Sequence, residues 1–352
     1  MRTTTVGIIS IGEMGLGIAK LLQDHNYRIV TVAAGRSEHT LARIHAAGIE
    51  ALDSDDDLVI QSDYILSIVP PRDALATATR IATACQAPET ARQRATLEDA
   101  NQQPCRSPLV YLELNATSAR LAKELGALFS GMSEEGPGTT MTTSSATSTG
   151  AEAVCWFLDG GIIGPPPALQ TPEGQQSGVW KKPSVVVSGP AVARLPATFP
   201  RLATALNVRV VSAEVGAAST LKMSFAALTK GLTALSILSV STAQRAQLLP
   251  ELLAHLDEYS PATGALARGG VVAMSPKAYR WVDEMRGIGQ TFEEEGGWEG
   301  VGASIYDGFA EIYRVVAEDT VLGGERAGAR VRGTSVGDAA EVIASRGTRK
   351  AE

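Results

Sequence analysis

The sequence predicts an α/β N-terminal domain with a doubly wound parallel sheet, followed by an all-α C-terminal domain. In the N-terminal third of the chain, short apolar runs alternate with segments of helical periodicity. Strands separated by helices pair in parallel, because the crossover returns the chain in the same direction. Beyond residue 212 one helical pattern follows another. We therefore expect domains at 1–212 and 213–345, which a chain of 352 residues can accommodate.

The individual elements follow from apolar periodicity and from the residues that interrupt it. We expect strands at 6–11, 28–33, 65–69, 110–114, 154–159 and 184–187. We expect helices at 12–25, 41–47, 217–244, 251–259, 277–285 and 304–319. Segments rich in polar, proline or glycine residues predict surface loop insertions near 88–108, 130–150 and 165–182.

Composition narrows the class of protein. The net charge of −7 disfavours nucleic-acid binding, which needs clustered Lys and Arg. Three scattered cysteines do not form a disulfide framework, and no His/Cys/Asp/Glu group has metal-ligand spacing, so we expect a cytoplasmic protein without a metal. Lys222 and Lys230 interrupt the apolar stretch 221–240 of the expected helix 217–244, which disfavours a membrane span. That long apolar helix instead predicts a homodimer interface.

A glycine motif lies between the first strand and the first helix. It reads Ile11-Gly12-Glu13-Met14-Gly15. In a Rossmann-type domain the first of these glycines lets the backbone approach a pyrophosphate, and the second permits close packing of helix on strand. The free N–H groups of the helix then face the phosphates. Ser10 stands where the fingerprint normally has its first glycine, and an ordinary tight turn is the alternative interpretation.

The end of the second strand predicts which dinucleotide is bound. Arg36 and Ser37 occupy a position where an NAD site usually has an acid for the ribose 2′-hydroxyl. A guanidinium and a hydroxyl favour a 2′-phosphate, through charge-assisted hydrogen bonds. We therefore expect NADP (NADPH) as the cofactor. The alternative is a solvated arginine on a surface loop.

Four segments, in this order, resemble the 3-hydroxyacid dehydrogenases, the superfamily that includes the cofactor domain of 6-phosphogluconate dehydrogenase and extends to the imine reductases. They are the glycine turn, Ser67-Ile68-Val69-Pro70-Pro71, Asp159-Gly160-Gly161-Ile162-Ile163-Gly164 and Gly216-Ala217-Ala218-Ser219-Thr220-Leu221-Lys222. The C-terminal part, with Thr229-Lys230-Gly231 and residues 278–285, resembles a branch with a phosphogluconate-dehydrogenase-like C-terminal domain.

The resemblance implies site residues. Lys222 corresponds to the catalytic lysine, Val69, Pro70 and Pro71 to the nicotinamide side, and residues 159–164 to the substrate loop. Candidate substrate contacts are Asn115, Ala116, Gly161, Ile162, Ile163, Gly164, Lys222 and Ala226, and Asn115 is also a candidate cofactor contact. Ile163 replaces a serine that binds the substrate carboxylate, and Ala226 replaces an asparagine. These departures predict a more apolar pocket than the family norm.

The resulting functional hypothesis is an NADP(H)-dependent oxidoreductase that acts on a hydroxyl or carbonyl group of a small-molecule substrate, with Lys222 as general acid/base. The first alternative is an imine reductase or reductive aminase, although such relatives usually have Asp or Tyr at the position of Lys222. The second is a non-catalytic NADP-binding sensor. For Lys222 itself, the alternatives are a side chain that reaches solvent or pairs with Glu214.

Overall fold

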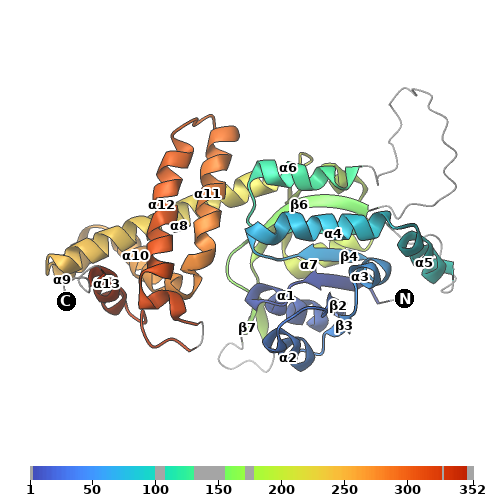
Figure 1. Cartoon of the computed structure of the whole chain (residues 1–352), viewed down its shortest axis with the longest axis horizontal. Helices are drawn as coiled ribbons and strands as arrows, with labels where there is room; N and C mark the ends of the chain where they lie inside the picture. Colours follow the sequence, from blue (N-terminus) through green and yellow to red (C-terminus); the bar gives the residue numbers. More distant parts are fainter. Residues whose placement is uncertain (1–2, 100–107, 131–154, 171–177, 327–328, 347–352) are drawn as a thin grey trace. The chain divides into compact units, whose positions relative to one another are not determined.

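The computed structural model describes residues 3–99, 108–130, 155–170, 178–326 and 329–346. They form two compact units, Met1–Lys222 and Met223–Glu352 (Figure 1). The division lies inside the long helix α8 (Ala217–Arg245), whereas the sequence places it at 212/213.

The first unit is built on an eight-stranded sheet with the order β10-β9-β6-β5-β4-β1-β2-β3. Its strands are β1 (Thr5–Ile9), β2 (Arg28–Val32), β3 (Glu50–Leu52), β4 (Tyr64–Ser67), β5 (Leu109–Glu113), β6 (Cys155–Ile163), β9 (Ser184–Ser188) and β10 (Val208–Ser212). The six strands from β6 to β3 are parallel to their neighbours. Strand β9 runs antiparallel to β6, and β10 parallels β9. The predicted fold class is confirmed, with this reversed pair at one edge as an addition.

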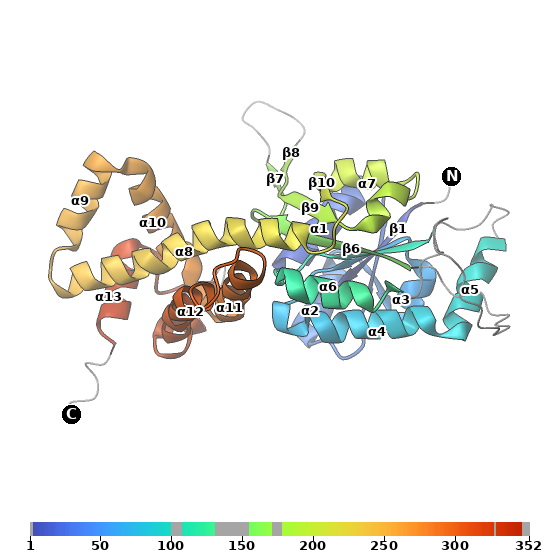
Figure 2. The ribbon, with the colours of Figure 1, turned by 90° about the horizontal axis from the view of Figure 1, so that it is seen from above.

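Helices cover both faces of the sheet. They are α1 (Glu13–Asp24), α2 (Glu38–Ala46), α3 (Asp55–Gln61), α4 (Ala74–Gln86), α5 (Pro88–Asp99), α6 (Ala119–Ala127) and α7 (Phe199–Leu206). One buried apolar cluster joins the sheet to α1, α2 and α7, and a second joins it to α3, α4 and α6. Figure 2 shows α7 on the side of the sheet opposite to α4 and α6.

The strand order reverses at β1, which lies between β2 and β4. The chain first runs outward from β1 through β2 to β3, and then crosses to β4 on the other side. Ligands of open α/β sheets bind outside the carboxyl ends of the strands at such a switch point. The glycine motif follows β1 directly and therefore stands at this position.

The loop insertions predicted from composition need correction. Residues 88–99 form helix α5, because Arg94 is buried there and donates hydrogen bonds to the carbonyls of Val59 and Ser62, each at 2.6 Å. A buried anchor of this kind cannot be read from a polar composition. The 165–182 segment contains a two-stranded ribbon, β7 (Ala168–Gln170) with β8 (Val179–Lys181). The 131–150 part of the remaining insertion lies outside the described residues.

In the described residues of the second unit, the greater part of α8 is followed by five further α-helices. These are α9 (Leu249–Tyr259), α10 (Pro261–Met274), α11 (Ala278–Glu294), α12 (Gly302–Glu318) and α13 (Val336–Ala344). Helices α11 and α12 run side by side (Figures 1 and 2). Lys230 of α8 forms an ion pair with buried Glu284 of α11, and its ammonium lies 4.8 Å from the centre of the Trp281 ring.

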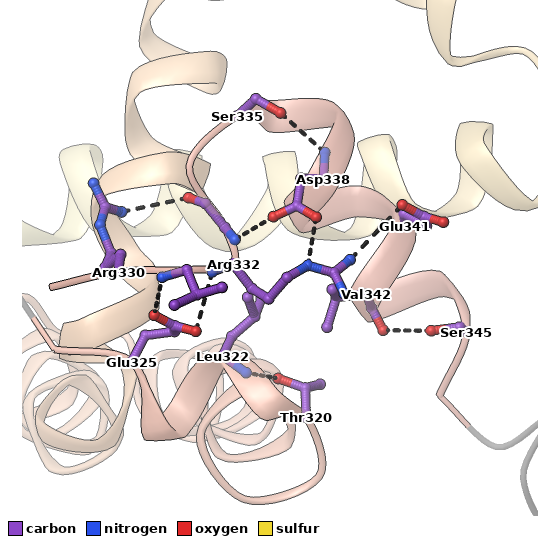
Figure 3. Close-up of polar contacts among 12 residues, drawn as sticks. Thr320, Leu322, Glu325, Arg330, Arg332, Ser335, Asp338, Glu341, Val342 and Ser345 are labelled. Atoms are coloured by element: carbon purple, nitrogen blue, oxygen red, sulfur yellow. Dashed lines mark hydrogen bonds and ion pairs between the residues drawn. The ribbon is translucent and has the colours of Figure 1, made fainter.

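Two carboxylates hold the segment between α12 and α13 (Figure 3). Glu325 accepts hydrogen bonds from the backbone N–H groups of Val331 and Arg332, at 2.7 and 3.1 Å. Asp338 accepts from the Arg332 side chain at 2.6 Å and from the Gly333 N–H. Desolvation opposes ionisation of Asp338, but these hydrogen bonds prevail and lower its pKa. The carboxylates thus satisfy the backbone donors of residues 331–333, which lie outside the helices.

Helix α8 has the length and composition to cross a membrane, yet half of its most apolar window is buried within the protein. The core helix of a water-soluble protein has the same properties, so this helix is weak evidence for a membrane span.

Candidate active site

The glycine turn has the backbone shape that a dinucleotide fingerprint requires. Ser10 adopts a φ of +78°, the left-handed conformation that a glycine would adopt without steric cost. A Cβ atom on Gly15 would lie 2.2 Å from the carbonyl oxygen of Ser10, so only glycine allows α1 to start this close to β1. A Cβ atom on Gly12 would meet nothing within 4 Å. Open space therefore lies beside Gly12, where the fingerprint places the pyrophosphate.

The first turn of α1 presents backbone donors at this place. The N-cap residue of α1 is Gly12, which has no side chain to accept a hydrogen bond from the N–H groups of the first turn. Ile11 is buried, Met14 packs against the core, and Glu13 is exposed. Of the predicted cofactor contacts in this turn, the backbone groups rather than these side chains are suited to bind phosphate.

Arg43 is a residue that the sequence analysis missed. It extends from α2 and donates a hydrogen bond to the carbonyl of Ile11 at 2.7 Å. This contact fixes the glycine turn and brings a positive charge to it. Because the contact depends on how α2 packs against the turn, no local sequence pattern indicates it.

A hollow of about 470 Å³ lies at the carboxyl end of β2. Its lining residues are Val32, Ala34, Gly35, Arg36, Asp53, Ser54, Asp55 and Arg80. Arg80 forms an ion pair with Asp55 at 2.8 Å, whereas Arg36 comes from the loop predicted to bind the 2′-phosphate. The hydroxyl of Ser37 caps α2 by accepting from the N–H of Thr40, so this side chain already has a structural role.

The turn after β4 is tied to the strand next to it. The N–H of Val69 donates to Asn115 Oδ1 at 2.6 Å, and Pro70 and Pro71 follow. Asn115 is buried, and its Nδ2 donates to Ser67 Oγ at 3.0 Å and to Glu113. Both donor hydrogens of the amide are therefore used within the protein. This leaves one lone pair of Oδ1 as the group that Asn115 can offer to a ligand.

Glu113 is a second residue that the sequence analysis missed. Its carboxyl is fully buried at the end of β5, and the Tyr111 hydroxyl donates to it at 3.2 Å. Burial raises the pKa of Glu113 to about 8, because the hydrogen bonds only partly offset the lost hydration. An acid at the last position of an otherwise apolar strand was the available sequence signal.

The predicted substrate loop 159–164 is mostly a strand. Strand β6 continues to Ile163 because it pairs with β9, and Gly164 then turns the chain with a φ of +121°. Ile162 is buried and Ile163 half-buried. A Cβ on Gly161 would lie 2.9 Å from the Cβ of Lys222, so this glycine lets the lysine stem pack directly on the strand.

Lys222 is half-buried near the start of α8, rather than fully buried. Among the described residues its ammonium has no hydrogen-bond or ion-pair partner, so the alternative of pairing with Glu214 is not seen. Ala226, one helical turn later, is buried, and Ala116 is half-buried. Within the described part of the chain, no three His, Cys, Asp or Glu side chains are arranged to hold a metal ion.

The comparisons with known proteins bear on both units. Residues 5–89 match the family described as "NADP oxidoreductase coenzyme F420-dependent", and residues 243–316 match a domain of unknown function (DUF1932). Together the two matches support the predicted superfamily. The match at 5–89 likewise supports the prediction of an NADP-binding domain. No curated protein matches the chain.

Solved structures with the same fold cover nearly the whole chain. A conserved protein of unknown function, described as structurally similar to 3-hydroxyacid dehydrogenases, has a TM-score of 0.54 and 20% identity over 89% of this chain and 98% of that one. Mycobacterium tuberculosis 3-hydroxyisobutyrate dehydrogenase has a TM-score of 0.52 and 12% identity over 90% of this chain and 98% of that one. A reductive aminase from Aspergillus terreus in complex with NADPH has a TM-score of 0.50 and 14% identity over 90% of this chain and 95% of that one. At these identities the likeness establishes the fold alone.

Proposed function

We propose that this protein is an NADPH-dependent oxidoreductase that transfers hydride between the nicotinamide and a hydroxyl or carbonyl carbon of a small substrate. The observation that carries the proposal is the placement of Lys222. Its stem packs on Gly161 of β6, within the same compact unit as the open glycine turn. One unit thus contains both a dinucleotide-binding turn and a half-buried amine that can exchange a proton.

Three groups fit the cofactor. The N–H groups at the start of α1 and the open space beside Gly12 suit the pyrophosphate, and Arg36 in the β2 hollow suits the 2′-phosphate. When bound, the nicotinamide supplies or accepts the hydride. The protein itself binds and orients the cofactor and transfers the proton that accompanies the hydride.

In this proposal Lys222 donates or accepts that proton. In the reductive direction, the carbonyl carbon gains a hydride and the ammonium of Lys222 donates a proton to the carbonyl oxygen, which yields an alcohol and a neutral amine. In the oxidative direction the neutral amine takes the hydroxyl proton as hydride leaves. Positioned general acid/base groups typically contribute about 10²–10⁴-fold to the rate.

Two substrate positions implied by the resemblance favour an apolar substrate. Ile163 and Ala226 replace the polar residues of the resembling family, and neither provides a hydrogen bond for a carboxylate. Reduction of an imine is the second candidate, because a C=N carbon also takes hydride while its nitrogen takes a proton. The structural similarity to a reductive aminase keeps this class open. Parallel assays with apolar ketones, 3-hydroxy acids and cyclic imines distinguish the classes.

The Lys222→Met variant tests the mechanism. We expect turnover to fall by about 10²–10⁴-fold, while the NADPH dissociation constant changes less than about twofold. The matched control is Lys20→Met, since Lys20 is an exposed lysine on α1. Normal turnover in Lys222→Met would show that the lysine assignment is wrong. NADPH binding without turnover of any substrate class by the wild type would favour the sensor hypothesis.

We also propose a homodimer through α8. Leu228, Leu235 and Leu238 lie at helical spacing on this helix and are 77, 50 and 41% exposed. An apolar face of this kind commonly marks a protein interface. Light scattering at micromolar concentration is expected to give twice the chain mass of 36.8 kDa. A single species with the mass of one chain would contradict the dimer.

A further inference from the structure

A row of four buried polar side chains crosses the sheet of the first unit. Ser67 of β4 is in register with Glu113 of β5, which is in register with Asp159 of β6, which pairs with Ser188 of β9. All four side chains are fully buried. Directly opposed residues of neighbouring strands project to the same face, so these polar groups form a continuous line.

One end of the row holds the start of α8. Asp159 Oδ2 accepts hydrogen bonds from Ser188 Oγ at 2.9 Å and from the backbone N–H groups of Gly216 and Ser219 at 2.9 and 3.1 Å. Its Oδ1 accepts from Ser219 Oγ at 2.6 Å. Ser188 Oγ in turn accepts from the N–H of Ala218 at 2.9 Å. Strand side chains thereby bind the backbone N–H groups of Gly216, Ala218 and Ser219 and the Ser219 hydroxyl, at the start of α8.

Lys222 follows this anchored turn after less than one further turn of helix. The hydrogen bonds to Asp159 fix where α8 begins and how it is rotated, because backbone and side-chain donors of different residues converge on one carboxylate. The Gly161 contact fixes the distance between helix and strand. Asp159 and Gly161 are two residues apart on β6 and together determine the position of the lysine stem.

The other end of the row holds the turn after β4. Glu113 and Ser67 both accept from the Asn115 amide, whose oxygen binds the N–H of Val69. Pro70 and Pro71 have no N–H groups, so the Val69 N–H is the last backbone donor before Arg72. The chain Glu113–Asn115–Val69 is therefore the tether of this turn.

We propose that this buried row is a positioning device for the active site, with Asp159 as the positioning residue for Lys222 and Asn115, held by Glu113, as that for the Val69–Pro71 turn. The inference rests on the proposed function, which assigns a proton-transfer role to Lys222 and the nicotinamide side to the turn. Catalytic groups must be held within a fraction of an ångström, which rigid strands achieve better than loops.

Two variants with different expected readouts test the row. Asp159→Asn turns an NH₂ group toward helix N–H donors, and we expect kcat to fall roughly tenfold or more, with the NADPH dissociation constant within twofold of wild type. Ser219→Ala removes only the hydrogen bond from the Ser219 hydroxyl to Asp159 and is expected to lower kcat less than Asp159→Asn does. Asn115→Leu releases Val69 and is expected to weaken NADPH binding roughly tenfold, since a tethered loop is pre-organised.

The control is Thr90→Val, which removes the partly buried hydrogen bond from Thr90 on α5 to Asp56 on α3 of the same unit. If Asp159→Asn and Ser219→Ala melt lower, as the control does, but retain wild-type kcat, the row is only structural and the proposal is overturned. Unchanged NADPH binding in folded Asn115→Leu would also overturn it. If the wild type binds NADPH but turns nothing over, the proposed function fails, and the binding measurement on Asn115→Leu still decides whether the row positions the turn.

Discussion

Gly12 and Gly15 belong to the same turn but have different surroundings. The sequence predicts close approach of a ligand at Gly12 and close packing at Gly15. The structure separates the two, because an added Cβ meets open space at Gly12 and the Ser10 carbonyl at Gly15. At the residue scale, Gly15 is required because a methyl group there would collide with the Ser10 carbonyl, whereas Gly12 leaves space that a ligand can occupy.

Alanine at these two positions is expected to act on different properties. Gly12 has a φ of −73°, which alanine adopts readily, so Gly12→Ala should keep its melting temperature and bind NADPH roughly tenfold or more weakly, a loss of about 1.4 kcal/mol per tenfold. Gly15→Ala should lose about 1–3 kcal/mol of stability through overpacking. Thermal unfolding and nicotinamide fluorescence measure the two effects. Equal NADPH affinity in Gly12→Ala and wild type would contradict the cofactor site.

Glu113 predicts how stability depends on pH. Its pKa rises on folding from the ordinary value of 4.5 to about 8, so the folded state binds the extra proton between these values. The resulting stabilisation is complete below pH 4.5 and is lost as the pH rises through about 8. Asp159, the neighbouring acid, also has a raised pKa, mainly because of desolvation, and acts in the same direction.

Glu113→Gln keeps the shape of the side chain and, like the protonated carboxyl, offers one acceptor oxygen and one donor group, but it cannot ionise. We expect its free energy of unfolding to fall less between pH 5 and pH 9 than that of wild type, and to exceed the wild-type value at pH 9. Urea denaturation at the two pH values measures this difference. Parallel pH profiles for the two proteins would show that Glu113 does not titrate in this range.

At the element scale, periodicity predicted most strands of the sheet and the long helix α8, but missed several helices, among them α4 and α10. Strands β1, β2, β4 and β5 and the long helix α8 lie close to their predicted positions. Helix α5 was missed because its anchor is a buried arginine, and the extension of β6 because its partner β9 is distant in sequence. The predicted Arg36, Lys222 and glycine turn needed only local pattern or resemblance, whereas Arg43 and Glu113 needed the packing of neighbouring elements.

The contact between β6 and α8 provides a prediction for two elements together. In Gly161→Ala the new methyl group would lie 2.9 and 3.0 Å from Cβ and Cγ of Lys222, near the base of the side chain where it cannot swing away. Helix α8 must therefore shift, and we expect kcat to fall roughly tenfold or more. Gly269→Ala on α10 is the control, because an added Cβ there meets nothing within 4 Å. If the two variants have equal kcat, the seating of Lys222 on β6 does not matter for turnover.

At the scale of the whole molecule, the features of the candidate site lie in one of the two units. The N-terminal unit contains the glycine turn, the β2 hollow, the buried polar row and Lys222, while the C-terminal unit is a helical assembly. A sequence can indicate this division through a change of periodicity. It does not identify the substrate, because Ile163 and Ala226, two of the predicted substrate contacts, are apolar and carry little chemical information.

The proposed function depends on binding of NADP(H) by the N-terminal unit through the glycine turn and Arg36. The most direct measurement is a titration of the purified protein with NADPH and with NADH, followed by nicotinamide fluorescence, and repeated with Arg36→Ala. We expect NADPH to bind roughly ten- to a hundredfold more tightly than NADH, in line with about 1.5–3 kcal/mol for hydrogen bonds to a charged group, and we expect Arg36→Ala to remove most of the difference. Failure to bind either dinucleotide would contradict the cofactor site and the oxidoreductase function with it.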